Sequence, residues 1–224
     1  MLKACVDLGG SISGEHGIGI DKREAMLWLF DAATLRQFRK IKRIFDPDNL
    51  CNPDKLIPAD DQALKAEVAA PPNESPVGTK ILDHDVENFT VTAEAAISVE
   101  ELRGLLASKN QKVLFEGRGT LAEILGENRP QEPRIRDQIL GMSVLFSDGT
   151  TGRFGGKVMK NVAGYDVAKL FLGSRGSLGI IRSVTLKTYP LQYSVTVRES
   201  REESVSPNAG ARKVMEKIKK GLDT

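Results

Sequence analysis

A proline-rich break divides the chain into two unequal pieces and limits the folds open to it. Pro71 and Pro72 follow two alanines, and Ser75-Pro76-Val77-Gly78 closes the stretch. Because each proline fixes φ and lacks a backbone N–H, neither a helix nor a central strand can run through here. We expect a first piece over residues 1–58, a linker over 59–80, a second piece over 81–190, and a polar loop with a short helix over 191–224.

Composition excludes several classes of protein. The 224 residues are 40% hydrophobic, which is enough to build a core. The 32 basic and 30 acidic residues leave a net charge of +2, so no strong field attracts nucleic acid or anionic lipid. No apolar run approaches the roughly 20 residues that cross a bilayer, and no secretory signal is expected. With only Cys5 and Cys51, a disulfide scaffold is excluded and a reducing, cytoplasmic location is expected.

A basic amphipathic helix is predicted in the first piece. Asp31 is a suitable N-cap, and apolar residues recur at spacings of three and four over Leu35–Phe45. Its other face carries five basic residues: Arg36, Arg39, Lys40, Lys42 and Arg43. This face is either a solvated surface or a patch for nucleic acid, and the first interpretation is favoured. Asp46-Pro47-Asp48 is expected to stop the helix.

The second piece mixes strands and helices, so the predicted fold class is α+β. Ser98 and Glu101 have the spacing of a capping box at the start of a helix. Ser147–Thr150 is predicted to turn one strand into a hairpin. Strands are expected over Phe89–Ala93, Lys112–Phe115, Leu140–Phe146 and Ile180–Tyr189, a short helix over Asp61–Val68, a loop over Glu199–Gly210 and a final helix over Ala211–Gly221.

Glycines are densest over Gly152–Asp166 and Gly173–Gly179. Glycine lets a backbone approach a ligand closely, and exposed N–H groups in such turns can cradle a pyrophosphate. However, the spacing matches neither a P-loop nor a dinucleotide-binding fingerprint. Spacing alone therefore favours tight turns in a β-rich domain over a phosphate site.

The residues of these turns resemble a known family. Lys160-Asn161-Val162-Ala163-Gly164-Tyr165-Asp166 resembles the Lys-Asn-x-x-Gly-Tyr-Asp signature of the FAD-linked oxidases. Gly173–Ile181 and Arg136–Gly141 resemble two further elements of the same flavin domain, which vanillyl-alcohol oxidase and p-cresol methylhydroxylase share. The resemblance covers about Ile81–Pro190 and implies a partial PCMH-type FAD-binding domain, with FAD as cofactor. It implies these cofactor-binding residues: Thr120, Arg134, Arg136, Asp137, Lys160, Asn161, Gly164, Tyr165, Asp166, Gly173, Ser174, Gly179 and Ile180.

The first piece resembles a different part of the same family. Gly10–Gly19, which contains Glu15-His16, is similar to the C-terminal active-site segment of glycolate oxidase and D-lactate dehydrogenase members. Phe45–Leu50 and Asn52–Lys55 match the end of that tail. The resemblance implies that His16 is a base that takes the hydroxyl proton while hydride passes to the flavin, a role that suits imidazole near neutral pH. The alternative is an ordinary loop histidine.

The same resemblance makes Glu15 a supporting carboxylate or a metal ligand. The histidine-rich segment that completes the family's metal site has no counterpart, so a complete metal site is not expected in this chain. The other histidine, His84, lies between Asp83 and Asp85 and is expected to be a surface residue.

Two departures from the family pattern bear on the cofactor. The first pyrophosphate loop of the family has no counterpart beyond Gly78-Thr79-Lys80. At the second loop the family has Thr-Leu-Gly-Gly, whereas this chain has Thr120-Leu121-Ala122-Glu123. The Cβ of Ala122 and the carboxylate of Glu123 both oppose an approaching diphosphate. We expect the affinity for FAD to be reduced, or to depend on a partner that supplies the loop.

Two functions remain open at this point. The first is an FAD-binding subunit of a 2-hydroxy-acid oxidoreductase acting on glycolate or D-lactate, with other glycolate-oxidase-type subunits as partners and contact with a membrane only through them. The second is a degenerate, non-catalytic subunit that keeps the fold and the partner surface without binding FAD tightly. In both cases the helix at Leu35–Phe45 is expected to pack on the second piece, and no nucleic acid is involved.

Overall fold

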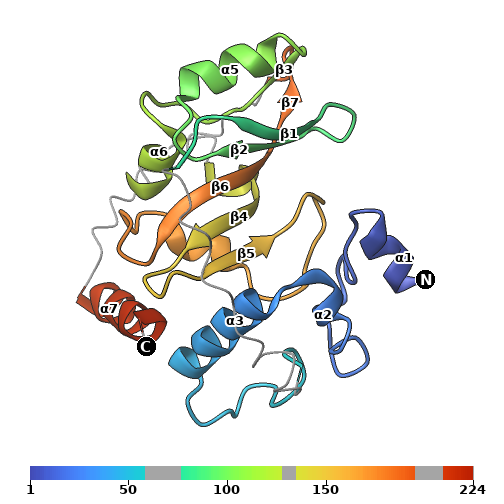
Figure 1. Cartoon of the computed structure of the whole chain (residues 1–224), viewed down its shortest axis with the longest axis vertical. Helices are drawn as coiled ribbons and strands as arrows, with labels where there is room; N and C mark the ends of the chain where they lie inside the picture. Colours follow the sequence, from blue (N-terminus) through green and yellow to red (C-terminus); the bar gives the residue numbers. More distant parts are fainter. Residues whose placement is uncertain (59–76, 128–134, 195–208, 224) are drawn as a thin grey trace.

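The computed structural model describes residues 1–58, 77–127, 135–194 and 209–223 (Figure 1). The elements follow in the order α1 (Leu2–Asp7), α2 (Met26–Leu29), α3 (Ala32–Phe45), β1 (Ile81–Asp85), β2 (Thr90–Glu94), α5 (Val99–Ala107), β3 (Gln111–Lys112), α6 (Leu121–Glu127), the 3-10 helix η1 (Ile135–Gln138), β4 (Ile139–Leu145), β5 (Thr151–Gly155), the 3-10 helix η2 (Val167–Phe171), β6 (Ile180–Lys187), β7 (Tyr189–Pro190) and α7 (Ala209–Asp223). None of the described helices is both long and apolar enough to pass through a bilayer.

A five-stranded antiparallel sheet forms the centre of the molecule. Its strand order is β1-β2-β6-β4-β5, and β3 pairs with β7 in a separate two-stranded ribbon. Alternation places Val91 and Val184 in the core with no exposed surface, while Thr92 and Thr185 lie on the other face with their hydroxyls 2.9 Å apart. Helices α5 and α6 lie at one end of the sheet and α3 at the other (Figure 1). The predicted α+β class is confirmed.

The predicted helix caps are present. Asp31 accepts a hydrogen bond from the N–H of Thr34 at 2.8 Å and starts α3. The Ser98 hydroxyl accepts from the N–H of Glu101 at 3.1 Å and starts α5. Both helices therefore begin where their sequence signals placed them.

Helix α3 packs on the second piece through an aromatic cluster. The fully buried Phe38 ring lies 5.8 Å from Phe154 on β5 and 5.6 Å from Tyr165, centroid to centroid. The Thr34 hydroxyl accepts a hydrogen bond from the N–H of Arg153, also on β5, at 2.9 Å. The expected packing of this helix on the second piece is confirmed.

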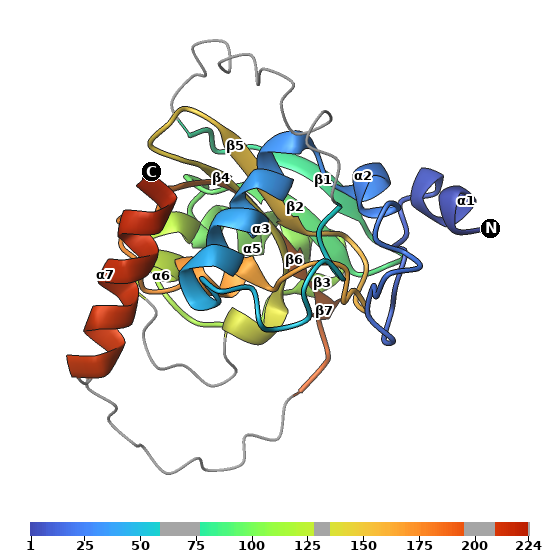
Figure 2. The ribbon, with the colours of Figure 1, turned by 90° about the horizontal axis from the view of Figure 1, so that it is seen from below.

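The basic face of α3 is only partly solvated. Lys42 pairs with Asp46, Arg39 donates to the Pro58 carbonyl, and Lys40 donates to the Leu222 carbonyl at 3.2 Å. Figure 2 shows why Leu222 is near: α7 lies alongside α3, and the two helices are in contact. The prediction of a plain solvated face is therefore wrong for these three residues: Arg39 and Lys40 bond to neighbouring segments, and Lys42 bonds to the end of its own helix.

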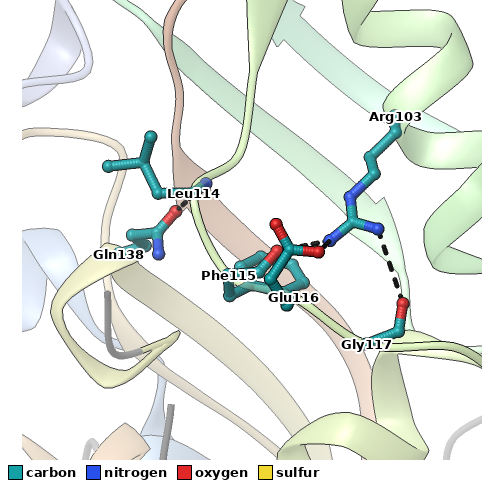
Figure 3. A network of polar contacts seen from close by, with 6 residues as sticks. All are labelled: Arg103, Leu114, Phe115, Glu116, Gly117 and Gln138. Atoms are coloured by element: carbon teal, nitrogen blue, oxygen red, sulfur yellow. Dashed lines mark hydrogen bonds and ion pairs between the residues drawn. The ribbon is translucent and has the colours of Figure 1, made fainter. Parts of the chain in front are cut away.

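One predicted strand is mostly a loop. Only Gln111–Lys112 pair as β3, whereas the prediction extended over Lys112–Phe115. Arg103 of α5 reaches across to this segment and donates to the carbonyls of Phe115 and Gly117 (Figure 3). The Gln138 side chain accepts from the N–H of Leu114 at 2.8 Å. Because side chains satisfy these backbone groups, the segment needs no partner strand.

His84 is a structural residue rather than a surface one. It is half-buried, and its Nε2 lies 2.9 Å from Oε1 of the buried Gln111. The same Oε1 accepts from Thr188 at 2.8 Å, and the Gln111 amide N–H donates to the carbonyl of Val86 at 2.7 Å. Since Oε1 can only accept, the His84 Nε2 carries the hydrogen. His84 thus ties β1 to β3, which corrects the expectation of a surface histidine.

Two other predicted segments differ from the structure in length, and two lie outside the described residues. Helix α7 spans Ala209–Asp223, so it is longer than the predicted Ala211–Gly221. Strand β6 ends at Lys187, two residues before the predicted end. The predicted helix at Asp61–Val68 and the predicted loop up to residue 208 lie outside the described residues.

The packing of α3 can be tested with two phenylalanines on the same helix. Phe38→Ala is expected to lower the free energy of unfolding by about 3–5 kcal/mol, because it removes a fully buried ring. Phe45→Ala, at a side chain that is 56% exposed, is the matched control and should cost about 1 kcal/mol or less. Urea unfolding of both variants measures the difference, and equal losses would contradict the packing.

Candidate functional site

Two loops far apart in the sequence meet at the seam between the pieces. The Ser11 hydroxyl donates to Oδ1 of Asn161 at 2.8 Å, although the residues are 150 positions apart. The N–H of Val162 donates to the carbonyl of Ser13 at 3.1 Å. An exposed ion pair joins Lys160 to Glu15. The resemblance assigns both loops to one active site, and the fold brings them into contact.

A cavity of about 670 Å³ lies along this seam. The first piece contributes His16, Lys42 and Cys51 to its lining, and the second piece contributes Tyr165 and Asp166. The remaining wall is largely apolar and includes Ile18, Ile41, Phe45, Leu56, Val167 and Leu170. A mostly apolar cavity of this size with a few polar groups is typical of small-molecule sites.

Lys42 and Asp46 form a charged pair in the wall of the seam cavity. Asp46 also accepts from the N–H groups of Leu50, at 2.8 Å, and Cys51, at 2.9 Å. The hydrogen bond from Lys42, joined by those from Cys51 and Leu50, lowers the pKa of Asp46. The hydrogen bond to Asp46 raises the pKa of Lys42. The pair therefore keeps a lysine cation at the cavity wall at neutral pH.

Tyr165 contributes a neutral hydroxyl to the same wall. Burial raises the pKa of its phenol, and the negative charge of Asp46 adds to this, while the positive charge of Lys42 opposes it. Tyr165 therefore stays protonated at neutral pH and can act as a hydrogen-bond donor.

The packing of Phe38 against the signature loop requires a glycine at position 164. Its φ is +81°, and a Cβ built there would lie 2.7 Å from the ring of Phe38. Any side chain would be strained twice, by the backbone and by the ring. The glycine of the family signature thus gives the Phe38 ring of α3 room to pack against the loop.

The remaining predicted residues of the loop are also engaged. Asn161 Oδ1 accepts from the N–H of Ala163 at 2.9 Å as well as from Ser11. Asp166 pairs with Lys169 at 2.9 Å. A smaller cavity of about 320 Å³ is lined by Asn161, Gly164, Tyr165 and Asp166 among others. Most polar groups of this loop therefore support the seam, while Tyr165 and Asp166 also border the large cavity.

A second cavity, of about 700 Å³, gathers other predicted cofactor residues. Thr120, Gly179 and Ile180 border it, together with Arg175, Glu123, Glu127 and several small or apolar side chains. Ser174, which adjoins this region in sequence, is buried, and its hydroxyl has no hydrogen-bond partner within the described part of the chain.

The segment after Thr120 corrects the sequence interpretation. The resemblance compares Thr120–Glu123 with a pyrophosphate loop, but Leu121–Glu127 forms α6. The Glu123 carboxylate accepts from the N–H of Thr120 at 2.8 Å, and the Thr120 hydroxyl accepts from the N–H of Glu123 at 3.2 Å. This reciprocal pair is a capping box, so Glu123 is present to start the helix.

The other predicted residues lie apart from both large cavities. Arg136 and Asp137 are exposed on η1, Gly173 is an exposed glycine with a φ of +76°, and Arg134 lies outside the described residues. In the described ranges, no group of three or more His, Cys, Asp or Glu side chains could hold a metal ion. Glu15 instead faces Lys160, so these residues do not fit the implied metal and we derive no step through one.

Comparison with known proteins places this site in context. Residues 1–56 match the family model of the C-terminal domain of FAD linked oxidases. Glycolate oxidase subunit GlcE of Escherichia coli is 32% identical over 120 residues, which cover 49% of this chain and 34% of the relative. Since 49% of the chain exceeds the matched 1–56 segment, that similarity reaches into the second piece. The first piece is thus similar to the C-terminal domain of FAD linked oxidases.

Further relatives carry similar names. Glycolate oxidase subunit GlcD of Escherichia coli is 50% identical over 58 residues, 26% of this chain and 12% of the relative. D-lactate dehydrogenase of Anaerostipes hadrus is 32% identical over 124 residues, 52% of this chain and 26% of the relative. The chain thus spans about a third or less of the length of these relatives. The resemblance stated from the sequence is confirmed, and the cofactor that it implies is FAD.

Residues that the resemblance assigns to FAD border cavities at two places. Thr120, Gly179 and Ile180 border a cavity whose charged lining residues are Arg175, Glu123 and Glu127. Tyr165 and Asp166 border the apolar seam cavity beside His16. Lys160, Asn161 and Gly164 are the predicted residues whose contacts are directed to the first piece.

Sequence reasoning misses the charged pair in the seam cavity. From the sequence, Lys42 belongs to the basic helix face and Asp46 only to the end of the helix. Their spacing of four residues at the end of a helix is the available signal, because such side chains lie over one another. What the sequence cannot show is that Tyr165 borders the same cavity as this pair.

Asp46→Asn should reveal the charged pair through pH. Because the pKa of Asp46 is lowered in the folded state, its ionised form stabilises the fold above the unfolded value of about 3.9, and this contribution is lost as pH falls through the folded pKa. The variant should therefore have a lower melting temperature than wild type at pH 7, with the difference shrinking as pH falls below about 4. The exposed Asp48→Asn serves as control, and a pH-independent difference would contradict the pairing.

Gly164→Ala isolates the contact with Phe38. Gly149→Ala is the matched control, because Gly149 has a similar φ of +78° but a Cβ added there would meet nothing within 4 Å. The control should lose about 1–2 kcal/mol of unfolding free energy from backbone strain alone. Gly164→Ala should lose clearly more in the same urea titration, because Phe38 must also move. Equal losses would mean that the ring does not press on Gly164.

Proposed function

We propose that this chain is the FAD-binding part of a 2-hydroxy-acid oxidoreductase that acts on glycolate or D-lactate. The observation that carries the proposal is the seam cavity, in which His16 from one piece and Tyr165 from the other border the same space. The names of the relatives support the substrate class, and the two exposed, free cysteines support a reducing, cytoplasmic location. Other glycolate-oxidase-type subunits are the partners that this function requires.

The chain's own residues would have separate tasks in such a reaction. His16 accepts the hydroxyl proton of the substrate, since it is the one histidine in the cavity lining. Tyr165, which stays protonated, donates a hydrogen bond into the cavity. The apolar wall formed by Ile18, Ile41 and Leu170 excludes water from the reacting carbon. When bound, FAD supplies the acceptor for the hydride that leaves the α-carbon.

A second function is favoured by one specific observation. Lys160 and Asn161 of the signature loop make their contacts with Glu15 and Ser11, so these polar groups already have partners inside the chain. A degenerate subunit that keeps the fold and a partner surface, without tight binding of FAD, would show the same arrangement. The two functions differ in whether the purified chain takes up FAD.

The test is FAD uptake by the full chain, alone and co-expressed with a GlcD-type subunit. The first function predicts flavin absorbance that survives desalting and a melting temperature that rises with added FAD, because a ligand that binds only the native state stabilises it. A colourless protein whose melting temperature ignores FAD, with and without the second subunit, would favour the degenerate subunit.

The two histidines provide a matched pair for the chemical step. His16→Asn should lower kcat for glycolate or D-lactate by about 100-fold or more while flavin content stays the same, since it removes the base. His84→Asn should leave kcat unchanged and lower only the thermal stability, because His84 serves the β1–β3 contact. The kcat of both variants is measured with a dye as electron acceptor. Full activity of the His16 variant would overturn the role of His16 as the base.

A further inference from the structure

The seam cavity contains a cation that the proposed chemistry does not use. Lys42 lies on α3 with a side chain that is 19% exposed, and its ammonium group is held by Asp46. Two neighbouring cavities share it as a wall residue, and Tyr165 also borders both. Because the lysine sits on a helix and its charge is fixed by a neighbour, it is a preorganised group rather than a freely moving side chain.

The pair retains the capacity to bind another anion. A lysine ammonium has three N–H donors, and Asp46 accounts for one of them in this structure. The negative charge of Asp46 is shared among Lys42 and the backbone N–H groups of Leu50 and Cys51. Asp46 therefore neutralises Lys42 less than an isolated carboxylate would.

The other charged groups in the cavity lining are less suited than Lys42 to bind an anion there. Lys55 is exposed, so solvent and salt screen its charge. Asp166 is exposed and pairs with Lys169 at 2.9 Å, which offsets its repulsion of an anion. His16 is exposed and is already assigned the role of the base. Lys42 is the half-buried cation beside the apolar wall.

We infer that Lys42 is the binding site in the seam cavity for the carboxylate of a small aliphatic acid, with Asp46 as the residue that positions it. The apolar wall suits the carbon chain, and the protonated Tyr165 hydroxyl can donate to a second carboxylate oxygen or to the ligand hydroxyl. A charge-assisted hydrogen bond from an ammonium in a largely apolar cavity is strong and selects acids over neutral alcohols. This inference deepens the proposed function and rests on it for the identity of the acid.

The test measures binding without turnover. The full-length chain is titrated with D-lactate and, separately, with D-lactamide, which has nearly the same shape and no charge, while the melting temperature is followed. D-lactate should raise the melting temperature in a saturable way and D-lactamide should not. Lys42→Gln should weaken D-lactate binding by about 10- to 100-fold, as expected for the loss of a charged hydrogen bond.

Further variants keep the test decisive. Lys42→Arg retains the charge and should bind D-lactate within a few-fold of wild type, so a loss confined to Lys42→Gln is due to the charge. If the glutamine variant folds poorly, Lys42→Met removes the same charge and should show the same loss. Lys109→Gln removes an exposed lysine that follows α5, at the opposite end of the molecule from α3 (Figure 1), and should bind as wild type does. Unchanged affinity in a folded Lys42→Gln protein, equal stabilisation by D-lactamide, or no stabilisation by D-lactate would overturn the inference.

The outcome separates the inference from the proposed function. Binding of D-lactate through Lys42 in a chain that takes up no FAD would contradict the oxidoreductase and leave the carboxylate site intact. Uptake of FAD by a chain in which Lys42 does not affect D-lactate affinity would support the flavin function and overturn the carboxylate site.

Discussion

The insertion of one phenylalanine ring is the contact on which the rest of this structure depends. Phe38 of α3 is fully buried, and its ring lies against the backbone of Gly164 and beside Phe154 and Tyr165. Aromatic rings bury a large apolar area and favour tilted or edge-on contacts of this kind. This ring is the largest buried contact between α3 and β5, and α3 carries Lys42 and Ile41 in the wall of the seam cavity.

The polar contacts of the seam follow from that packing. Lys42, Asp46 and Tyr165 come together because Phe38 fixes the distance between α3 and the signature loop. Ser11 and Asn161 extend the same contact along the first glycine-rich loop. The cavity thus forms where the first piece packs on the second. Its charged pair, Lys42 and Asp46, lies beside an apolar wall, where water screens a charge less than it does in solution.

Local signals predict the parts of the fold that local physics decides. The caps at Asp31 and Ser98 and a strand that starts at Ile180 appear as expected. The failures arise where a residue serves a distant partner. His84 bonds to Gln111, and Arg103 replaces a strand ladder by bonding to loop carbonyls, and no spacing within the sequence predicts either contact.

The candidate site is predictable in its motifs and not in its electrostatics. The resemblance identifies His16 and the loop through Tyr165, and the fold brings both to one cavity. The sequence predicts that Glu123 opposes a phosphate, whereas in the structure Glu123 caps α6. The prediction fails because the family pattern does not reveal that a helix starts after Thr120. The Lys42–Asp46 pair gains a role only once the second piece closes over it.

A double-mutant cycle between Phe38 and Phe154 tests most directly that the two pieces form one folded unit around the seam. Urea unfolding of Phe38→Leu, Phe154→Leu and the double variant gives the coupling between the two rings. We predict a coupling of about 0.5–1.5 kcal/mol, as is typical of buried aromatic pairs in contact. A coupling of zero, with additive losses, would show that the rings do not meet and that the seam cavity does not exist as described.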